Sequence, residues 1–411
     1  MSRLLWAGPW NERSAIALFG TLVVDELAAA GHEVEVVRTE VGADLLLPPR
    51  PAPGPIHLPS AWAPDGFDGV IVNLGNYYGF HGAAMAMLQG AAPLVILHDA
   101  WLGDLVNGWR HHAGDDAWRV NRFLHGAPDP SGVQALCGFA SGVVVHGPHY
   151  RDAAAAACAG PVAVIPLAYA APVLPLPRPF GKRLTVATIG HVNSNKRVDE
   201  VIRALGASER LRHQVLYTLI GPVEPEERAR LENLAQHVGV PALHFTGYVP
   251  DEVLHSLMAG TDVICCLRHP VLEGGSASLI TALLSGRPTL VSDHASYAAV
   301  PDGMVLKCSP GHEAAHVLHY LEAILDDPAA AMAMGARARA YALQEFAPAS
   351  YCARLLPVLD AATLAQPAIM TARKVGRRLA ELGIEADDRM VHRMDALLAG
   401  MLRGTKDSPH E

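Results

Sequence analysis

One stretch of the chain combines residue types that could bind an anion and a ligand rich in hydroxyl groups. In residues 271–293, VLEGGSASLITALLSGRPTLVSD, Glu273 precedes five small residues and an apolar helical pattern that ends at Gly286. A helix start rich in glycine and serine offers free backbone N–H groups at the positive end of the helix dipole, which favours phosphate. The carboxylate of Glu273 could accept hydrogen bonds from hydroxyl groups. The stretch therefore indicates a site for a phosphorylated sugar, although an ordinary helix–strand unit would give the same pattern.

The loop at residues 190–197, GHVNSNKR, carries the most suggestive positive charges. Lys196 and Arg197 end a turn that opens the next helix, and Lys196 is expected to face the same cleft as the small residues after Glu273. A cation beside a helix N-terminus suits a diphosphate, whose negative charge grows when it leaves. A solvent-facing loop lysine remains the alternative for Lys196 taken alone.

Two further candidates lie in the first half of the chain. His98 follows the apolar run at 93–97, and polar residues after a buried strand are where doubly wound sheets bind ligands. Gly8 begins a loop between a short strand and a helix. The two residues could equally be a structural histidine and a tight turn, and the loop at Gly8 lacks a full dinucleotide fingerprint.

Segments of strand and helix character alternate through both halves of the chain. The expected strands are 4–7, 32–37, 69–74, 93–97, 142–146 and 162–166, then 184–189, 214–220, 244–246, 263–267, 289–292 and 305–307. This alternation predicts an α/β fold of two doubly wound parallel-sheet domains, with the ligand site in the cleft between them. The expected boundaries are 1–166 for the first domain, 167–182 for a proline-rich linker, 183–345 for the second domain and 346–411 for helices that pack back toward the first domain.

Composition excludes several classes of protein. The net charge of −9 argues against a nucleic-acid partner. Six scattered cysteines without a CxxC motif predict buried, reduced thiols. No apolar run approaches the roughly 18 residues of a membrane span, and the N-terminal apolar run is too short for a signal peptide. The sequence therefore predicts a cytoplasmic protein, with peripheral contact at the inner face of the membrane left open.

At this level of detail the chain resembles a known family. Residues 188–202, 245–263 and 267–293, together with 74–85, 95–105 and 144–152, are similar to the retaining GT-B glycosyltransferases of family 4 that assemble bacterial polysaccharides. The resemblance covers roughly residues 1–360. It implies the GT-B fold, transfer of a hexose or deoxyhexose from a nucleotide diphosphate sugar to a glycan or lipid-linked acceptor, and no cofactor or metal.

The resemblance also implies roles for matching residues. Glu273 matches the first acid of the E-x7-E motif, which contacts the donor sugar; Lys196 matches the lysine on the diphosphate, and His98 a histidine near the transferred sugar. These three are the expected catalytic residues. Matching donor-binding positions are Gly8, Gly190, Arg197, Tyr248, Val249, Gly274, Gly275, Ser276, Ala277 and Ser278.

Two positions depart from the family pattern. The second acid of E-x7-E, which usually holds the ribose, falls at Thr281, and the arginine that usually follows the loop glycine is His191. These departures motivate an alternative, a catalytically inactive GT-B partner that scaffolds another transferase. An epimerase or a phosphorylase with the same fold is a weaker alternative. A dinucleotide oxidoreductase is disfavoured, because neither half begins with GxGxxG and an acid about 20 residues on.

Overall fold

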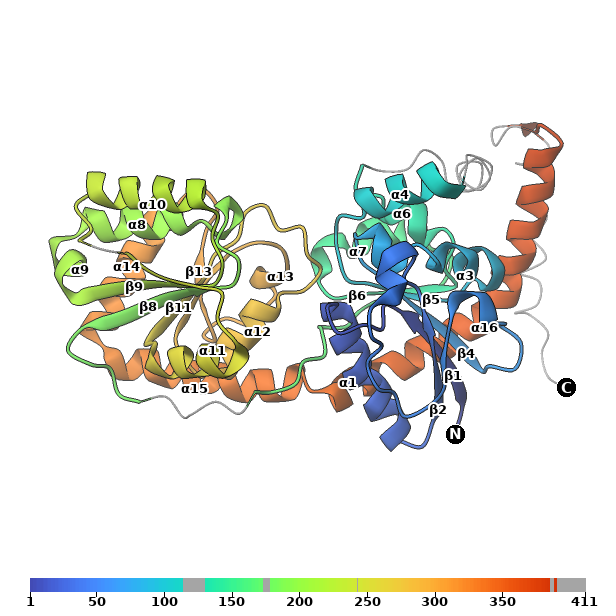
Figure 1. Ribbon diagram of the computed structural model, residues 1–411, viewed down its shortest axis with the longest axis horizontal. Helices are drawn as coiled ribbons and strands as arrows, with labels where there is room; N and C mark the ends of the chain where they lie inside the picture. Colours follow the sequence, from blue (N-terminus) through green and yellow to red (C-terminus); the bar gives the residue numbers. More distant parts are fainter. Residues whose placement is uncertain (114–129, 173–177, 242, 385–387, 390–411) are drawn as a thin grey trace, which may run out of the picture.

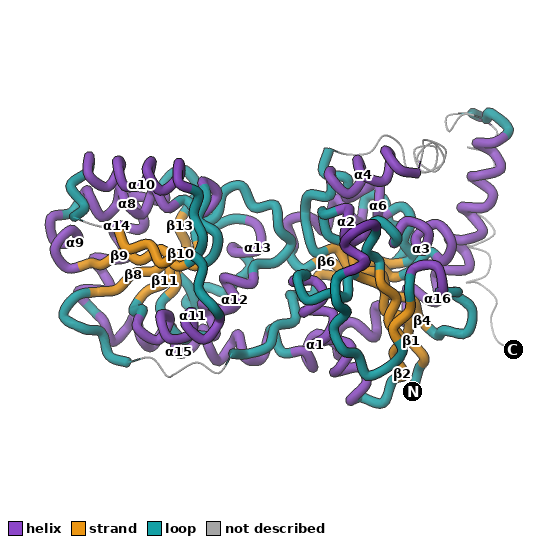
Figure 2. Tube along the Cα trace, viewed as in Figure 1, coloured by secondary structure: helices purple, strands orange, loops and turns teal. Residues whose placement is uncertain are grey.

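The computed structural model describes residues 1–113, 130–172, 178–241, 243–384 and 388–389. Figure 1 shows two lobes joined by extended segments and by long C-terminal helices. Each lobe is built on one parallel sheet with helices on both faces, and Figure 2 shows loops between the two lobes. This confirms the predicted fold class, an α/β architecture of two doubly wound sheets.

The first lobe contains a seven-stranded sheet in the described part of the chain, in the order β3-β2-β1-β4-β5-β6-β7. All of its pairs are parallel, so the carboxyl ends of the strands share one edge. The strands are β1 (Arg3–Gly8), β2 (Glu33–Arg38), β3 (Ile56–His57), β4 (Gly69–Leu74), β5 (Leu94–Leu97), β6 (Gly142–Val145) and β7 (Val162–Val164). The order reverses between β1 and β4, which is the kind of position where such sheets bind ligands.

Helices cover both faces of this sheet. The longest helix of this group, α1, starts at an N-cap where Ser14 Oγ accepts a hydrogen bond from Ala17 N, and Gly31 with φ +91° follows its end. The helices and 3-10 turns of the lobe are α1 (Ala15–Ala29), η1 (Gly42–Leu46), η2 (Pro59–Ala61), α2 (Tyr78–His81), α3 (Ala84–Ala91), α4 (Gly103–Ala113), α6 (Val133–Cys137), η3 (Pro148–Tyr150) and α7 (Arg151–Ala155).

The second lobe contains a six-stranded parallel sheet among the described residues, in the order β10-β9-β8-β11-β12-β13. Its strands are β8 (Leu184–Ile189), β9 (Val215–Ile220), β10 (Leu243–Gly247), β11 (Val263–Cys266), β12 (Thr289–Ser292) and β13 (Leu306–Cys308). The surrounding elements are η4 (Ser194–Lys196), α8 (Val198–Ala207), α9 (Glu209–Gln214), α10 (Pro225–His237), α11 (Asp251–Gly260), α12 (Ala277–Leu284), α13 (Ala295–Ala298), α14 (Glu313–Asp326) and α15 (Pro328–Glu345).

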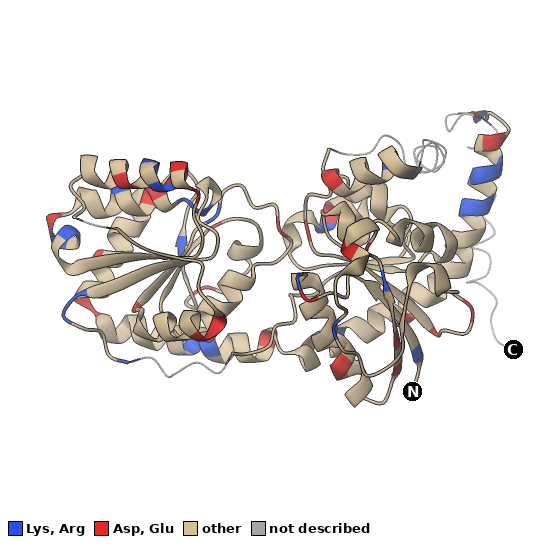
Figure 3. Cartoon of the chain, viewed as in Figure 1, with Lys and Arg blue, Asp and Glu red and all other residues tan. Residues whose placement is uncertain are grey.

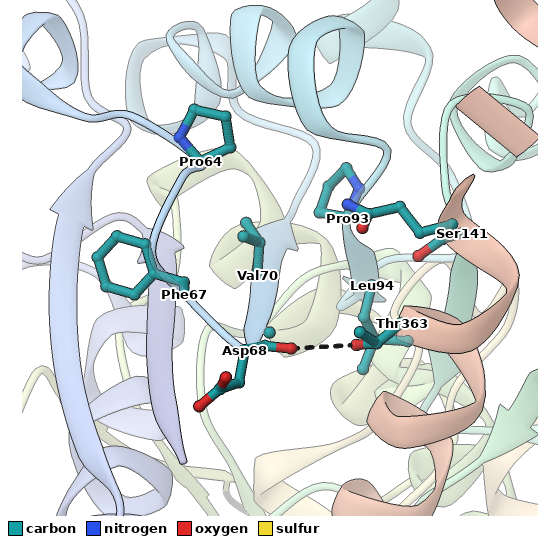
Figure 4. Close-up of a pocket in the computed structure, with 10 residues that line it drawn as sticks. Pro64, Phe67, Asp68, Val70, Pro93, Leu94, Ser141 and Thr363 are labelled. Atoms are coloured by element: carbon teal, nitrogen blue, oxygen red, sulfur yellow. Dashed lines mark hydrogen bonds between the residues drawn. The ribbon is translucent and has the colours of Figure 1, made fainter. Parts of the chain in front are cut away.

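The last described helix returns the chain to the first lobe. Helix α16 (Pro348–Glu381) follows α15 and packs against α1 and β6 (Figure 1). Cys352, Leu355 and Leu359 enter the same core as Trp6 and Phe19. Between this helix and the start of β4 lies a cavity of about 70 Å³, beside which Thr363 Oγ1 donates a hydrogen bond of 3.5 Å to Asp68 O (Figure 4). The first lobe is therefore completed by residues from the far end of the chain.

The same helix has the length and composition of a membrane span. Among the helices that the structure describes, it contains an 18-residue window with mean hydropathy 1.3, of which 17% is buried. Core helices of soluble proteins pass the same test, so one such helix is weak evidence. Pro357 and Pro367 also lie inside it.

Some predictions about organisation need comment. The stretch 46–66, in which no strand was predicted, contains η2 and the short edge strand β3, whose Ile56 pairs with Val36. The domain boundaries at 166, 182 and 345 stay predictions, and residues 173–177, 385–387 and 390–411 of the expected linker and tail lie outside the described residues. All six cysteines are buried and none forms a disulfide, as predicted.

Candidate active site

A cavity of about 760 Å³ lies between the two lobes. Its lining from the first lobe includes α1 and the loops after β4 and β5, and its lining from the second lobe includes α11 and the loop before α12. Five of the predicted site residues line it: His98, Glu273, Gly275, Ala277 and Thr281. Residues from both halves of the chain thus meet in one cavity, as the cleft prediction required.

Direct main-chain contacts join the two lobes beside this cavity. Gly274 N donates to His98 O at 2.9 Å, and Ala100 N donates to Leu272 O at 2.9 Å. Asp99 and Glu273 thereby form an antiparallel bridge between the lobes. The bridge sets Glu273 next to His98, and it uses the Gly274 amide, one of the donors expected to face phosphate.

His98 is buried at the end of β5 and belongs to a chain of polar groups. Its Nε2 lies 3.0 Å from Asn73 Oδ1, and its Nδ1 lies 3.2 Å from Nε2 of His146, whose Nδ1 lies 2.9 Å from Ile165 O. Burial lowers the pKa of His98 well below its usual value and lowers that of His146 to about 4. Both ring nitrogens of His98 thus face other protein groups, and the neutral ring adds no charge to the cavity wall.

Glu273 is held by three partners from its own lobe. Arg268 Nε lies 3.0 Å from Glu273 Oε1, and Tyr297 Oη donates to the same oxygen at 3.1 Å. Tyr297 Oη also lies 3.0 Å from Oγ of Ser276, the N-cap of α12. The second carboxylate oxygen of Glu273, Oε2, accepts a hydrogen bond of 3.3 Å from Leu272 N. The carboxylate therefore has a fixed position on the cavity wall.

Asp99 adds a carboxyl group whose charge changes with pH near neutrality. Its Oδ2 accepts a hydrogen bond of 2.8 Å from Asn76 N. Burial, and to a smaller extent the charge of Glu273, raise the pKa of Asp99 to about 6. The cavity thus has a second carboxyl group, with a raised pKa, beside the lobe-to-lobe bridge.

Lys196 ends η4 and is buried, with 7% of its surface exposed. Its Nζ donates to Ile189 O. Burial and then the charge of Arg268 lower the pKa of Lys196 to about 8. Gly190, with φ +97°, leaves room for this side chain, because a Cβ there would lie 3.0 Å from Lys196 Nζ and 3.6 Å from Ser278 Oγ. Lys196, Gly190 and Ser278 thus lie together, but none of the three belongs to the described lining of the cavity.

The remaining predicted residues lie in different surroundings. Arg197 faces Glu200 at 3.4 Å and the buried Glu313 at 3.5 Å, so other carboxylates engage its charge. Tyr248 is 80% exposed, and Val249 packs against the core of the second lobe. A Cβ at Gly8 would lie 3.1 Å from Asn73 Cβ. The described lining of the cavity includes none of these four.

Thr281 is buried, and its Oγ1 lies 2.8 Å from Oη of Tyr169 in the segment between the lobes. The hydroxyl at the position of the second acid is therefore already engaged.

Sequence reasoning missed several residues that shape the site, above all Arg268, Tyr297, His146 and Tyr169. Each is a single polar residue in an otherwise apolar or irregular stretch, which gives no periodic signal. Arg268 was the easiest of the four to predict, because it lies five residues before Glu273 in a segment that resembles the family. Among the described residues, no group of three or more His, Cys, Asp or Glu side chains is placed to hold a metal ion.

Comparisons with known proteins agree with this fold. Residues 177–341 match the family model described as Glycosyl transferases group 1. No curated protein matches the chain at a significant level. Among solved structures, sucrose-phosphate synthase from Thermosynechococcus elongatus has a TM-score of 0.60 and 16% identity, with 87% of this chain and 98% of that chain covered.

Two further structures show the same likeness. HepE from Anabaena in complex with UDP and glucose has a TM-score of 0.59 and 14% identity, covering 87% of this chain and 99% of that chain. WaaG, a glycosyltransferase involved in lipopolysaccharide biosynthesis, has a TM-score of 0.53 and 16% identity over 87% and 99%. At these identities the likeness shows the fold. The chain therefore has the GT-B fold that these structures share, and its residues 177–341 match the model of the group 1 glycosyltransferases.

Proposed function

We propose that the protein is a retaining glycosyltransferase that moves a hexose or deoxyhexose from a nucleotide diphosphate sugar to a glycan or lipid-linked acceptor in cell-surface polysaccharide biosynthesis. One observation carries this proposal. The main-chain bridge of 2.9 Å between Gly274 N and His98 O puts Glu273 of one lobe and His98 of the other on the wall of the same cavity. A donor sugar bound there would contact a carboxylate and a neutral imidazole together.

The residues have distinct roles in this reaction. Glu273 accepts hydrogen bonds from sugar hydroxyls beside the neutral ring of His98, while Lys196 neutralises the diphosphate as its bond to the anomeric carbon breaks. The acceptor oxygen forms the new bond on the same face of the sugar, and its proton passes to the departing phosphate oxygen. Atoms and charge then balance without a covalent enzyme intermediate or a cofactor. UDP-glucose, the ligand of a solved HepE structure, is a natural first donor to test.

A donor screen tests the proposal directly. Purified protein is incubated with UDP-, GDP- and dTDP-sugars, and release of the nucleotide diphosphate is measured. We expect turnover with at least one donor. Lys196→Ala and Glu273→Ala should each lower it by about 100-fold or more, whereas Lys182→Ala and Glu226→Ala, which change exposed residues, should not. A wild-type protein inert toward every donor, or near-normal rates in either site variant, contradicts the proposal.

A second candidate is an inactive GT-B partner that scaffolds another transferase. The observation that favours it is the hydrogen bond between Tyr169 and Thr281, which occupies the hydroxyl where the family has a ribose-binding acid. His191 is exposed in place of the second loop cation. Calorimetric titration with nucleoside diphosphates separates the two functions, because absence of binding at millimolar nucleotide favours the scaffold.

We also propose a cytoplasmic location with peripheral contact at the inner face of the membrane. The outer part of α16 carries exposed Lys374, Arg377 and Arg378 at one end of the molecule (Figure 3). Such a cluster is attracted to anionic lipid headgroups by roughly 1 kcal/mol per charge. Sedimentation with anionic vesicles should exceed that with neutral vesicles, and changing the three residues to Gln should abolish the difference. Equal sedimentation with both vesicles contradicts membrane contact.

A further inference from the structure

Arg268 is fixed beside the loop that carries Lys196. It follows β11, and its backbone N–H donates a hydrogen bond of 2.8 Å to Ser292 Oγ at the end of β12. The next residue, His269, donates its N–H to Asn195 O at 2.8 Å. The chain around Arg268 is thus clamped between the sheet and the turn that ends in Lys196.

The two cations share one environment and one nearby carboxylate. The Arg268 side chain is 17% exposed, and Glu273 is its ion-pair partner at 3.0 Å. Lys196 is buried, and its Nζ donates to a backbone carbonyl. The positive charges of both residues act on the buried Cys266 thiol, which lies close to both. One buried and one partly exposed positive charge facing one carboxylate leave a local excess of positive charge, and a bound anion would balance it.

The cation expected next to Lys196 is unsuitable for this role. Arg197 is engaged by Glu200 and by Glu313, which is 2% exposed. His191, where the family pattern has an arginine, is exposed. The loop at 190–197 therefore supplies Lys196 as its cation for the site, and the second charge has to come from another element.

We propose that Arg268 is that second cation and binds the diphosphate of the donor together with Lys196, an inference that rests on the proposed transferase function. The planar guanidinium can donate two parallel hydrogen bonds to phosphate oxygens, which a lysine cannot do. Its bond to Glu273 also ties the phosphate-binding group to the sugar-binding carboxylate. The chain thus replaces the arginine missing at 191 by an arginine from the loop after β11.

Binding of free nucleotides tests this role without any need for turnover. Calorimetry compares UDP with UMP, GDP with GMP and dTDP with dTMP, on the wild type and on Arg268→Gln. We expect Arg268→Gln to weaken diphosphate binding about tenfold or more, which corresponds to about 1.4 kcal/mol, and to change monophosphate binding much less. Arg203→Gln is the matched control, because its side chain is 51% exposed on α8. Arg268→Lys, which keeps the charge and loses the fork, should bind with intermediate affinity.

A second readout separates a binding role from a structural one. Lys196 must be protonated to bind phosphate, so diphosphate affinity of the wild type should fall above about pH 8. Removal of the neighbouring positive charge raises the pKa of Lys196, so in Arg268→Gln this fall should move to higher pH. Glu273→Gln should bind free UDP or GDP at least as well as the wild type, because it removes a negative charge.

The outcomes distinguish the two proposals. A wild type that binds none of UDP, GDP and dTDP overturns the transferase function, and the role of Arg268 with it. A wild type that binds diphosphates while Arg268→Gln retains full affinity overturns only the role of Arg268. The role of Arg268 is also overturned if Arg268→Gln weakens monophosphate and diphosphate binding equally, because the arginine then only supports the fold. It is overturned as well if Glu273→Gln weakens diphosphate binding as much as Arg268→Gln does, because the arginine then only supports the carboxylate.

Discussion

Nδ1 of His98 and Nε2 of His146 face each other at 3.2 Å with no other group between them in the hydrogen-bonded chain. Ile165 O can only accept, so Nδ1 of His146 carries its proton. Asn73 Nδ2 donates to Ala7 O, so its Oδ1 accepts from Nε2 of His98. In the neutral pair two lone pairs therefore meet, and a proton added to the pair would be shared between the rings.

The buried histidines should make the fold sensitive to acid. Burial lowers the pKa of His81 to about 3 and that of His146 to about 4, and lowers that of His98 well below 6.5. The unfolded chain then binds three more protons as pH falls from 6.5 toward 4, and each removes about 1.4 kcal/mol of stability per pH unit. Asp99 acts in the opposite sense between pH 6 and 3.8, because its folded pKa is raised, and it offsets one of the three.

Urea unfolding at pH 7, 6 and 5 measures this effect. The free energy of unfolding should fall with pH, and His146→Gln should reduce the slope by about 1.4 kcal/mol per pH unit, since one proton fewer is taken up. His255→Gln, which changes a histidine on α11 outside this network, serves as the control. An unchanged slope in His146→Gln contradicts the assignment.

The contrast between what the sequence predicted and what it missed has a physical basis. The order of strands and helices follows from repeating patterns of apolar residues, which the sequence displays directly. The proximity of Lys196, Gly190 and Ser278 follows from loops at the shared carboxyl edge of one sheet. The bridge between 98–100 and 272–274 is made by main-chain atoms of two lobes, and no residue type encodes it.

Single polar residues were harder still to interpret. Tyr169 lies in a proline-rich stretch that gave no reason to expect a contact with Thr281. In the sequence Arg268 is one of many loop cations, and only the fold shows that it lies close to Lys196 and Glu273. Such residues gain a meaning only when distant segments are brought together.

A pair of adjacent glycines tests the contact between the lobes. A Cβ at Gly274 would collide with Tyr150 Oη and lie 2.7 Å from His98 O, whereas a Cβ at Gly275 would meet its nearest neighbours at 3.4 Å. Gly274→Ala should therefore break the bridge to His98, lower the melting temperature and reduce transfer about tenfold or more. Gly275→Ala, the matched control, should keep near-normal stability. Equal melting temperatures for the two variants contradict this explanation.

A double-mutant cycle can measure the energy of the contact between Tyr169 and Thr281. The two hydroxyl groups are 2.8 Å apart and join the segment between the lobes to α12. Tyr169→Phe and Thr281→Val each remove one partner, and their free energies of unfolding should show a coupling of about 1 kcal/mol. Additive effects of the two changes would show that the hydrogen bond contributes nothing to stability.

Glu40 should fix the conformation of the loop that leads into α1. It is fully buried, and its Oε1 accepts hydrogen bonds of 2.8 Å from both Trp10 N and Asn11 Nδ2. Its ion pair with Arg38 at 3.2 Å is also buried. Glu40→Ala leaves the arginine charge without its partner, so the free energy of unfolding should fall by about 3–5 kcal/mol.

The same substitution should affect one substrate more than the other. Asn11 Oδ1 accepts from Arg13 N and Ser14 N, and both of these residues line the cavity on the side of the first lobe. A loosened loop should therefore raise the KM for the acceptor several-fold and leave nucleotide affinity, measured by calorimetry, near its wild-type value. Glu33→Ala, at an exposed position in β2, is the control for both measurements. If Glu40→Ala instead weakened nucleotide binding and spared the acceptor, the loop would serve the donor side, since its residues would then have to reach across the cavity to the second lobe.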